Sequence, residues 1–349
     1  MNQKNVLVLF GGTSPEHEIS MASAAAIIAS LGRHNVIPVY ISKNGSWLLY
    51  DGKLDNIQSI DWEKFGTPAV LSPAQTNGGL LRIVGDKVKI IPVDIVFPAL
   101  HGRDGEDGTV QGLCELAAIP YVGCGVLSSA LCMDKAFTKM IARNLRIPQS
   151  EYLVFTRDDV ANMSTVYRKV RTKLGYPCFV KPIGCGSSIG ITKAKDKDSL
   201  KDAIELALKY GNKVVLEKTV IGREIEIGVL GNGANAQASV LGEIIHKEEF
   251  YDYDTKYANA DTTTIIPADL PEETAETIRK YALDIFKAVD GRGMARVDFF
   301  VNEDGKVIFN EINTVPGFTN ISMYSKMWEA SGVPPQVLIE RLLELAIES

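Results

Sequence analysis

The stretch that most constrains the fold runs from Ala295 to Asn313 and reads ARVDFFVNEDGKVIFNEIN. Two runs rich in β-branched and aromatic residues flank the dipeptide Asp304-Gly305. An Asp-Gly pair between two such runs predicts a β-hairpin with a two-residue loop. With this loop Glu303 faces Lys306, and the pairing of all other residues in the two strands follows from it.

Four polar side chains share one face of this predicted hairpin. Counting back from the loop places Asp298 opposite Glu311 and Arg296 opposite Asn313, and cross-strand partners and residues two apart point the same way. Directly opposed carboxylates would lie ~5 Å apart. Their repulsion would be ~3 kcal/mol at an effective dielectric constant of about 20. We therefore expect a positive charge that compensates for it.

A solvated sheet face, where water screens the two acids, is the alternative. Both faces are largely apolar, however, with Val297, Phe299, Val301, Ile308 and Ile312 on one and Phe300 and Phe309 on the other. Paired buried charge usually recruits a metal or a cationic group, so we favour a cation site. Asp, Glu and Asn offer the hard oxygen ligands that suit Mg²⁺, which in enzymes usually arrives bridged to phosphates. The hairpin therefore predicts a nucleotide-phosphate site, where Arg296 would hold an anionic group.

At 349 residues the chain is long enough for two or three domains with substantial cores. Its composition, 46% hydrophobic and 23% charged, is that of a soluble globular protein. The net charge of −6 gives no reason to expect nucleic acid or a membrane as a partner. No apolar run has the length of a signal peptide core or a transmembrane helix, and the odd cysteine count without metal-type spacing indicates reduced thiols, so we expect a cytoplasmic protein. The cysteines, expected in the core, are Cys114, Cys124, Cys132, Cys178 and Cys185.

The N-terminal third has the pattern of a doubly wound parallel sheet. Apolar strands are expected at 5–10, 36–41 and 93–100, with a helix after the Gly11-Gly12 turn that runs to about Ser30. Ser14 suits the N-cap of this helix and Pro15 its first position. Glu16 then lies in the first turn, where complementing the helix dipole is its simplest role. The glycines lack the full dinucleotide-binding spacing, so a nicotinamide cofactor is poorly supported.

A turn-rich loop, HGRDGEDG, follows the strand at 93–100 and precedes a helix from about Thr109 to Ala118. Ligands of such sheets bind at the carboxyl ends of the strands. His101, Arg103 and Glu106 are therefore candidates to line a pocket. A well hydrogen-bonded loop histidine explains the spacing equally well.

Two further loops are candidates for contacts with a nucleotide. The loop GCGSSIG at 184–190 follows the strand that ends at Lys181, and its glycines and serines allow backbone N–H groups to approach phosphate oxygens. A flexible hairpin tip is the simpler explanation for this loop alone. The polar stretch from Asp254 to Thr264 has the length of a functional lid or a disordered segment, with Lys256 and Tyr257 as its candidate contacts.

Eight segments, taken together, resemble the D-alanine–D-alanine ligases of the ATP-grasp superfamily. In chain order they read GGTSPEHEIS, HGRDGEDG, MDK, VKPIGCGSSIG, LEKTVIGRE, DTKY, RVDFF and NEINTVPGFTNISMY. The resemblance spans nearly the whole chain and implies an α/β ATP-grasp fold with three domains. These would be an N-terminal domain with the doubly wound parallel sheet at 1–130, a central subdomain at 131–219 and a C-terminal subdomain at 220–349.

The resemblance also implies a reaction. ATP would phosphorylate the carboxylate of a first D-alanine, and the amino group of a second would displace the phosphate to give D-alanyl-D-alanine for peptidoglycan. Two Mg²⁺, which Mn²⁺ could replace, would be bound by Asp298, Glu311 and Asn313, as the hairpin also predicts. The residues implied in binding ATP are Lys135, Lys181, Ser188, Glu217, Lys218, Val220, Glu224 and Lys256, with Glu224 at the ribose.

Further roles that the resemblance implies concern the two substrates. Arg296 would stabilise the tetrahedral oxyanion. Glu16 would bind the ammonium of the first substrate and be linked through Ser187 to Tyr257 on the lid, which excludes water when it closes. The residues implied near the second substrate are His101, Ser322 and Met323. A homodimer is the oligomer that the family suggests.

The choice of second substrate is the least constrained point. Tyr257 and Met323 favour D-alanine, because relatives that use D-lactate often lack the tyrosine and those that use D-serine or D-lactate often have arginine at the methionine position. Ser325 departs from the proline common after the tyrosine at 324, which affects local geometry more than chemistry. The alternatives are a D-alanine–D-serine or D-alanine–D-lactate ligase and a catalytically silent nucleotide-binding protein. The presence of Arg296 and all three metal ligands argues against the silent protein.

Overall fold

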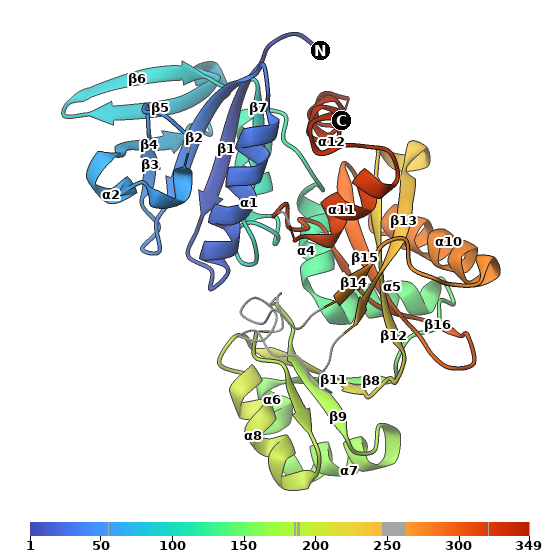
Figure 1. The fold of residues 1–349 in the computed structure, drawn as a ribbon. Helices are drawn as coiled ribbons and strands as arrows, with labels where there is room; N and C mark the ends of the chain where they lie inside the picture. Colours follow the sequence, from blue (N-terminus) through green and yellow to red (C-terminus); the bar gives the residue numbers. More distant parts are fainter. Residues whose placement is uncertain (55, 185, 187–188, 246–262, 320, 349) are drawn as a thin grey trace.

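In a computed structural model, the described residues form three β-sheets with helices around them (Figure 1). The structure describes residues 1–54, 56–184, 186, 189–245, 263–319 and 321–348. The predicted division into domains at 1–130, 131–219 and 220–349 remains a proposal.

The N-terminal sheet has seven strands in the order β6-β5-β4-β3-β2-β1-β7. The parallel core that the sequence predicts is formed by β2, β1 and β7, and β3 to β6 extend it as antiparallel strands. The strands are β1 (Asn5–Gly11), β2 (Asn35–Ile41), β3 (Trp47–Leu49), β4 (Thr67–Leu71), β5 (Gly79–Val84), β6 (Lys87–Pro92) and β7 (Ile95–Pro98). The connecting helices are α1 (His17–Ser30), η1 (Ile57–Ser59), α2 (Trp62–Phe65), η2 (Gln75–Asn77) and α3 (Thr109–Ala117).

The first helix begins later than the sequence predicts. Helix α1 starts at His17, and Glu16 occupies the N-cap position without a side-chain cap. Ser14 is therefore not the N-cap; its hydroxyl accepts a hydrogen bond from the backbone N–H of Glu16 (3.2 Å) in the turn before the helix. This turn places the Glu16 side chain at the entrance to α1, where it is buried.

The central sheet has four antiparallel strands in the order β10-β9-β11-β8. They are β8 (Tyr152–Thr156), β9 (Cys178–Pro182), β10 (Thr192–Ala194) and β11 (Lys213–Lys218), with α6 (Arg157–Val160), α7 (Met163–Lys173) and α8 (Lys197–Ala207) against them. Residues 157–173 form two helices rather than one. Asn162 separates them, because its side chain caps α7 by accepting from the N–H of Thr165.

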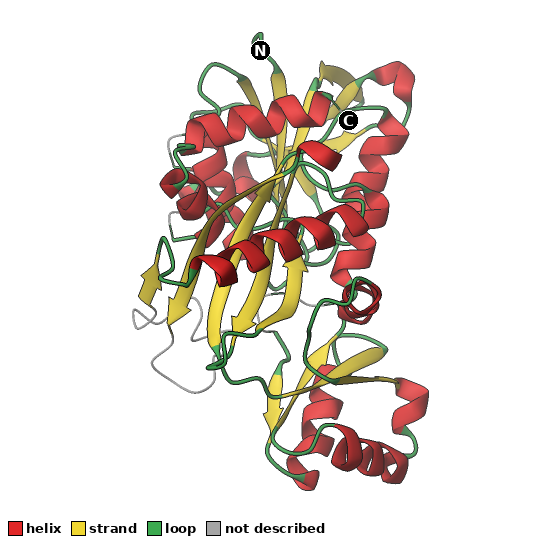
Figure 2. Cartoon of the chain, turned by 90° about the vertical axis from the view of Figure 1, so that its right-hand side faces the viewer, coloured by secondary structure: helices red, strands yellow, loops and turns green. Residues whose placement is uncertain are grey.

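The C-terminal sheet has five antiparallel strands in the order β14-β13-β12-β15-β16. They are β12 (Arg223–Leu230), β13 (Gln237–Ile245), β14 (Thr263–Ile265), β15 (Met294–Val301) and β16 (Val307–Asn313), and η3 (Gly233–Asn235) precedes β13. The helices on this sheet are α4 (Val126–Met133), α5 (Lys135–Asn144), α10 (Glu272–Ala288) and α11 (Met323–Ala330). Helix α10 lies across the strands (Figure 2). Because side chains alternate along a strand, Ile225 and Ile227 pack toward α10, while Glu224 and Glu226 point to the opposite face.

The predicted pairing of the central hairpin is confirmed. Strand β15 pairs with β16 so that Asp298 lies opposite Glu311 and Arg296 lies opposite Asn313. The two carboxylates thus sit side by side on the face of the sheet away from α10.

The predicted two-residue loop is wrong, and a second irregularity cancels the error. The N–H of Asn302 donates to the carbonyl of Lys306 (3.2 Å), so three residues form the loop. The third, Gly305, has a left-handed φ of 76°, which is usual for a three-residue loop built on a type I turn. A bulge at Asn310 then adds one residue to β16 and restores the predicted pairing beyond it.

The shifted register near the loop changes which aromatic residues meet. The sequence predicts Ile308 on the same face as Phe299, and Phe309 on the same face as Phe300. In the structure Phe299 is paired with Phe309 instead, and their ring centroids are 6.0 Å apart. Both rings are buried in the core under α10. The loop length accounts for this correction, since a one-residue change in register turns every side chain to the other face.

The last helix, α12 (Pro335–Ile347), returns to the N-terminal sheet. Leu338, Leu342 and Leu343 are buried in one core with Val6 and Val8 of β1, and α12 lies beside α1 and β7 (Figure 1). The C-terminal helix therefore packs against the first strand of the chain. Within the described ranges no helix is both long and apolar enough to cross a bilayer.

The role of α12 can be tested with two substitutions on its opposite faces. Leu342 is fully buried, so we expect Leu342→Ala to lower the free energy of unfolding by about 2–5 kcal/mol. Val337 is 54% exposed, and we expect Val337→Ala to change the free energy of unfolding by less than about 0.5 kcal/mol. Urea unfolding of both variants measures the difference. Equal effects would mean that α12 does not close the N-terminal core.

Candidate active site

A row of three carboxylates crosses the C-terminal sheet. Glu226 of β12 pairs with Asp298 of β15, which pairs in turn with Glu311 of β16. Sequence reasoning missed Glu226. Its only local signal is that Glu224 and Glu226 alternate with isoleucines, which shows a polar strand face but not which strand lies next to it.

Arg296 lies against this row and neutralises part of its charge. Its guanidinium donates two hydrogen bonds of 2.8 Å to Asp298 and lies 3.1 Å from Glu226 Oε2. Burial alone would lower the pKa of Arg296, but Asp298 and Glu226 raise it well above its ordinary value. A permanent cation at this point is the compensating charge that the hairpin predicts.

A second cation reaches the row from helix α5. Lys135 is the first residue of this helix, and Asp134 caps it by accepting from the N–H groups of Ala136 and Phe137. The Nζ of Lys135 lies 3.2 Å from Glu311 Oε2. The cap therefore positions a lysine directly over the outermost acid of the row.

The donor set at the end of the hairpin fits a hard divalent cation that brings other ligands with it. Asp298 and Glu311 offer carboxylate oxygens, and Asn313 offers an amide oxygen that also accepts from the N–H of Val315 (3.1 Å). Nowhere in the described part of the chain do three or more His, Cys, Asp or Glu side chains form a group that could hold a metal ion. Mg²⁺ keeps several non-protein ligands, usually water and phosphate oxygens, so this incomplete set suits a metal–nucleotide complex.

Glu217 at the end of β11 forms a separate buried charge cluster. Lys139 lies 3.3 Å from its Oε1, and Lys181 lies 3.2 Å from its Oε2, which also accepts from Ser150 (3.2 Å). Burial would raise the pKa of Glu217, but the two lysines lower it to about 2. Sequence reasoning predicted Lys181 and Glu217 and missed Lys139, although it follows Lys135 by four residues, one turn along the same helix.

Lys181 connects this cluster to the carboxylate row. Its Nζ donates to Asn310 Oδ1 (3.4 Å) on β16, next to Glu311. The side chain thus spans from the central sheet to the C-terminal sheet. Lys135 thus contacts the carboxylate row, and Lys181 links Glu217 to the strand that carries Glu311, an arrangement that suits an extended anionic ligand.

Three other predicted nucleotide contacts lie around the turn from β11 to β12. Lys218 is exposed at the end of β11, and Val220 and Glu224 are half-buried around the start of β12. The structure brings these three residues to the same end of the two strands as Glu217.

The predicted substrate residues of the N-terminal part lie near the other loops. Glu16 is buried, and a Cβ atom on Gly186 would lie 3.3 Å from its Oε1, so the backbone at Gly186 approaches it closely. His101 is buried, with its Nε2 2.9 Å from Ser23 Oγ and its Nδ1 3.2 Å from the carbonyl of Val315. Since a carbonyl only accepts, Nδ1 carries the proton.

Glu106 and His101 form a buried pair. Glu106 Oε1 lies 3.5 Å from Nδ1 of His101. Burial alone would lower the pKa of His101, but Glu106, with smaller contributions from Glu16 and the carbonyl of Val315, raises it above its ordinary value. The histidine is therefore both a well hydrogen-bonded residue and a candidate site residue, and the two possibilities left open by the sequence coexist.

Ser322 and Met323 lie at the start of α11. The hydroxyl of Ser322 is 2.7 Å from that of Thr319. Met323 is buried and packs toward Gly242 of β13, because a Cβ atom there would overlap its Cε. Four other predicted site residues, Ser187, Ser188, Lys256 and Tyr257, lie outside the described residues.

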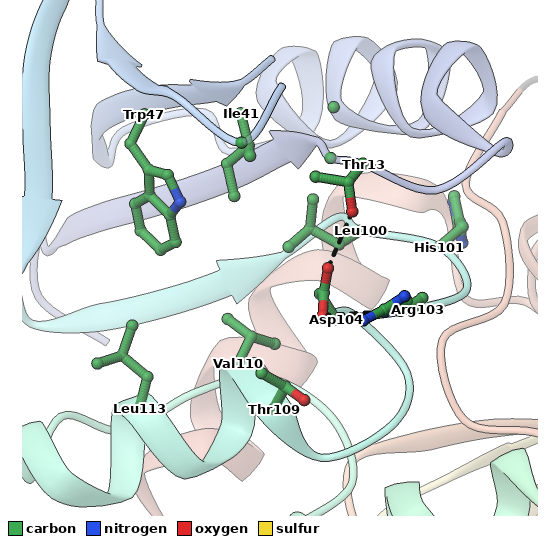
Figure 3. Close-up of a pocket in the computed structure, with 13 residues that line it drawn as sticks. Thr13, Ile41, Trp47, Leu100, His101, Arg103, Asp104, Thr109, Val110 and Leu113 are labelled. Atoms are coloured by element: carbon green, nitrogen blue, oxygen red, sulfur yellow. Dashed lines mark hydrogen bonds and ion pairs between the residues drawn. The ribbon is translucent and has the colours of Figure 1, made fainter. Parts of the chain in front are cut away.

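A cavity of about 280 Å³ lies in the N-terminal part at the carboxyl ends of β1, β2 and β7 (Figure 3). His101 and Arg103 line it as predicted, whereas Glu106 is not among its lining residues. Its walls are mainly apolar, with Ile41, Trp47, Leu100, Val110 and Leu113. At its rim the Thr13 hydroxyl donates to Asp104 (3.0 Å). This hydrogen bond links the loop before Glu16 to the loop after His101.

Two family models cover most of the chain. Residues 5–124 match the D-ala D-ala ligase N-terminus and residues 141–344 match the D-ala D-ala ligase C-terminus. The D-alanine–D-alanine ligase of Acetivibrio thermocellus is 49% identical over 99% of this chain and 96% of its own length. That of Caldicellulosiruptor bescii is 48% identical over 100% of this chain and 96% of its own length.

Solved structures agree with the sequence relatives. The VanG D-Ala:D-Ser ligase from Enterococcus faecalis has a TM-score of 0.89 and 37% identity, covering 99% of this chain and 100% of that one. The D-alanine–D-alanine ligase from Coxiella burnetii has a TM-score of 0.85 and 37% identity, covering 100% of this chain and 95% of that one. The match in fold extends over the whole length, as does the match in sequence. The chain belongs to the D-alanine–D-alanine ligase family, and its fold is that of these ATP-grasp ligases.

Proposed function

We propose that this protein joins two D-alanine molecules to D-alanyl-D-alanine with the consumption of ATP, and so supplies the dipeptide for peptidoglycan. The observation that carries the proposal is the Arg296 guanidinium held between Glu226 and Asp298, next to Glu311 and Lys135. This arrangement offers an anion-binding cation, hard oxygen ligands and phosphate-binding lysines in one place. Ligation through an acyl phosphate needs all three.

ATP would lie along the line from the carboxylate row to Glu217. Lys135 and Lys181 would bind its phosphates, Glu217, Lys218 and Val220 its base region, and Glu224 its ribose. Asp298, Glu311 and Asn313 would hold Mg²⁺ or Mn²⁺, which when bound neutralises phosphate charge. Ser188 and Lys256 remain proposed contacts of the phosphates.

The reaction would proceed on the Arg296 side of the row. The carboxylate of the first D-alanine takes the terminal phosphoryl group of ATP, and the amino group of the second attacks the resulting acyl phosphate. The tetrahedral oxyanion would accept hydrogen bonds from Arg296, whose charge is fully present because its pKa is raised. Phosphate then leaves as the amide forms.

The substrates themselves would be bound by the loops of the N-terminal part. Glu16 would accept from the ammonium of the first D-alanine, linked through Ser187 to Tyr257 on the lid. His101 and Ser322 would lie near the second. Closure over the site would exclude water, which otherwise hydrolyses the acyl phosphate.

A second candidate is a D-alanine–D-serine ligase, since a solved structure similar to this chain is a D-Ala:D-Ser ligase. Tyr257 and Met323 favour D-alanine as the second substrate. We also propose the three domains at 1–130, 131–219 and 220–349, and a homodimer as in the family. Because the reaction consumes ATP, the proposal places the enzyme in the cytoplasm.

The first test measures ADP release and product mass with D-alanine, D-serine and D-lactate, singly and in mixtures. We expect turnover with D-alanine alone and a product with the mass of D-alanyl-D-alanine. Turnover only in mixtures would favour the D-serine or D-lactate alternative. ATP binding without turnover under any condition would indicate a silent nucleotide-binding protein.

The role of Arg296 is tested by Arg296→Lys, which keeps a positive charge between Glu226 and Asp298 but loses the guanidinium fork. We expect kcat to fall about 10²-fold or more, with little change in KM for ATP, because the lost interaction forms with the oxyanion. Arg279→Lys on the outer surface of α10 is the matched control and should retain full activity. A variant whose KM rises while kcat is unchanged would contradict the role.

Metal dependence is tested at Glu311. Chelation of divalent cations should abolish ADP release, and added Mg²⁺ should restore it. We expect Glu311→Gln to raise the Mg²⁺ concentration for half-maximal activity by at least about 10-fold. Glu303→Gln, in the exposed loop of the same hairpin, is the control and should leave it unchanged. An unaltered Mg²⁺ requirement in Glu311→Gln would remove this residue from the metal site.

A further inference from the structure

The side chain of Lys139 is almost fully enclosed although it carries a charge. Only 1% of it is exposed, and its Nζ lies 3.3 Å from Glu217 Oε1. Lys135 precedes it by one turn of α5 and reaches Glu311 instead. One helix thus directs one lysine to the carboxylate row and the next to Glu217.

A buried lysine is costly unless a defined partner keeps it charged. Burial and the nearby Lys181 lower the pKa of Lys139, while Glu217 and the more distant Glu311 oppose this. Its Nζ also lies over the ring of Tyr152, whose centroid is 5.4 Å away. Glu217 is therefore the principal partner of Lys139.

The two lysines at Glu217 differ in what else they touch. Lys181 also donates to Asn310, beside the carboxylate row, so it lies at the phosphate end of the proposed nucleotide. A bound phosphate would share the charge of Lys181. Lys139 lies behind Glu217 and is enclosed, so it remains paired with Glu217 when nucleotide binds. It is the cation that keeps the carboxylate ionised throughout.

An ionised Glu217 constrains what part of a nucleotide can face it. A carboxylate only accepts hydrogen bonds and repels phosphate, so it must face a donor group. Adenine offers a donor in its exocyclic amino group, whereas guanine has an acceptor, its carbonyl oxygen, at the same ring position. A fixed negative charge therefore attracts one base and repels the other.

We propose that Lys139 is a positioning residue for base discrimination: it holds Glu217 as an ionised acceptor, so that the site takes an adenine nucleotide and rejects a guanine nucleotide. The inference rests on the proposed ATP-dependent function. It goes further by assigning the choice of base to a residue that does not itself touch the nucleotide.

The test compares kcat/KM for ATP and for GTP in Lys139→Met, with D-alanine as substrate. We expect the ATP-to-GTP ratio to fall about 10- to 100-fold, through a higher KM for ATP and with little change in kcat, because a donor–acceptor contact of this kind discriminates by about this factor. Lys139→Arg keeps the charge and should restore most of the ratio. The matched control is Lys169→Met, on the exposed side of α7.

A pH profile provides a readout that a purely structural role would not change. The folded-state pKa of Glu217 is about 2, below its ordinary value of 4.5, so the wild-type carboxylate is ionised at every pH above about 4.5. Because Glu217 does not titrate between about pH 5.5 and 8, we expect the wild-type KM for ATP to show no contribution from its protonation in this range. In Lys139→Met the pKa of Glu217 rises, so KM for ATP should increase as the pH falls. Lys181 is then the one close cation left to it among the described residues.

The double variant Lys139→Met with Glu217→Gln shows whether Lys139 acts through Glu217. Without the carboxylate, removing Lys139 should cause no further loss of discrimination. Should Lys139→Met fail to fold, Lys139→Gln carries the same comparison with a polar side chain. Equal losses for ATP and GTP, or an unchanged ratio in a folded variant, would overturn the inference.

A failure of the proposed ligase function can be told apart from a failure of the inference about base discrimination. If the wild type does not turn over ATP with D-alanine, the function fails, and titration with ADP and GDP by calorimetry still measures base discrimination in each variant. A wild type that binds both nucleotides equally would overturn the inference, even with full ligase activity.

Discussion

The ion pairs of Arg296 make the rest of the site possible. Three adjacent strands bring Glu226, Asp298 and Glu311 into one row, and without a cation their repulsion would oppose formation of the sheet. The guanidinium contacts two of these acids and Lys135 contacts the third. The row is thus stable before any ligand arrives. A ligand that binds there must exchange these internal partners for its own, which selects for groups with high charge density, such as metal-bound phosphates.

Contacts between distant parts of the chain hold the two halves of the site together. The imidazole of His101, at the end of the first sheet, meets the carbonyl of Val315, just after the last strand. Ser23 of α1 lies beside His101 and accepts from the N–H of Phe318. Helix α12 adds an apolar contact with β1. The loop at His101 and helix α1 are therefore held against the segment that directly follows the strand carrying Glu311.

Sequence reasoning predicted the parts of the site that lie within one hairpin or one loop. The pair of Asp298 and Glu311 was predicted although the loop was not, because the bulge at Asn310 compensates for the extra loop residue. Glu226 and Lys139 were missed, since each meets its partner only when strands or helices far apart in the chain become neighbours. Alternation along a strand and four-residue spacing on a helix indicate which way a side chain points. They do not indicate what lies opposite.

The bulge at Asn310 also bears on how this hairpin can change during evolution. Between the loop and the bulge, β16 is offset by one residue relative to the predicted alignment, and beyond it the site begins. Loss of a single residue at position 310 would let the loop-side register continue to the end of the strand. Glu311 would then follow Phe309 directly and would still lie opposite Asp298, and Asn313 would keep its place opposite Arg296. One codon deletion would therefore remove the bulge and the Asn310 partner of Lys181 but leave the row of acids in place.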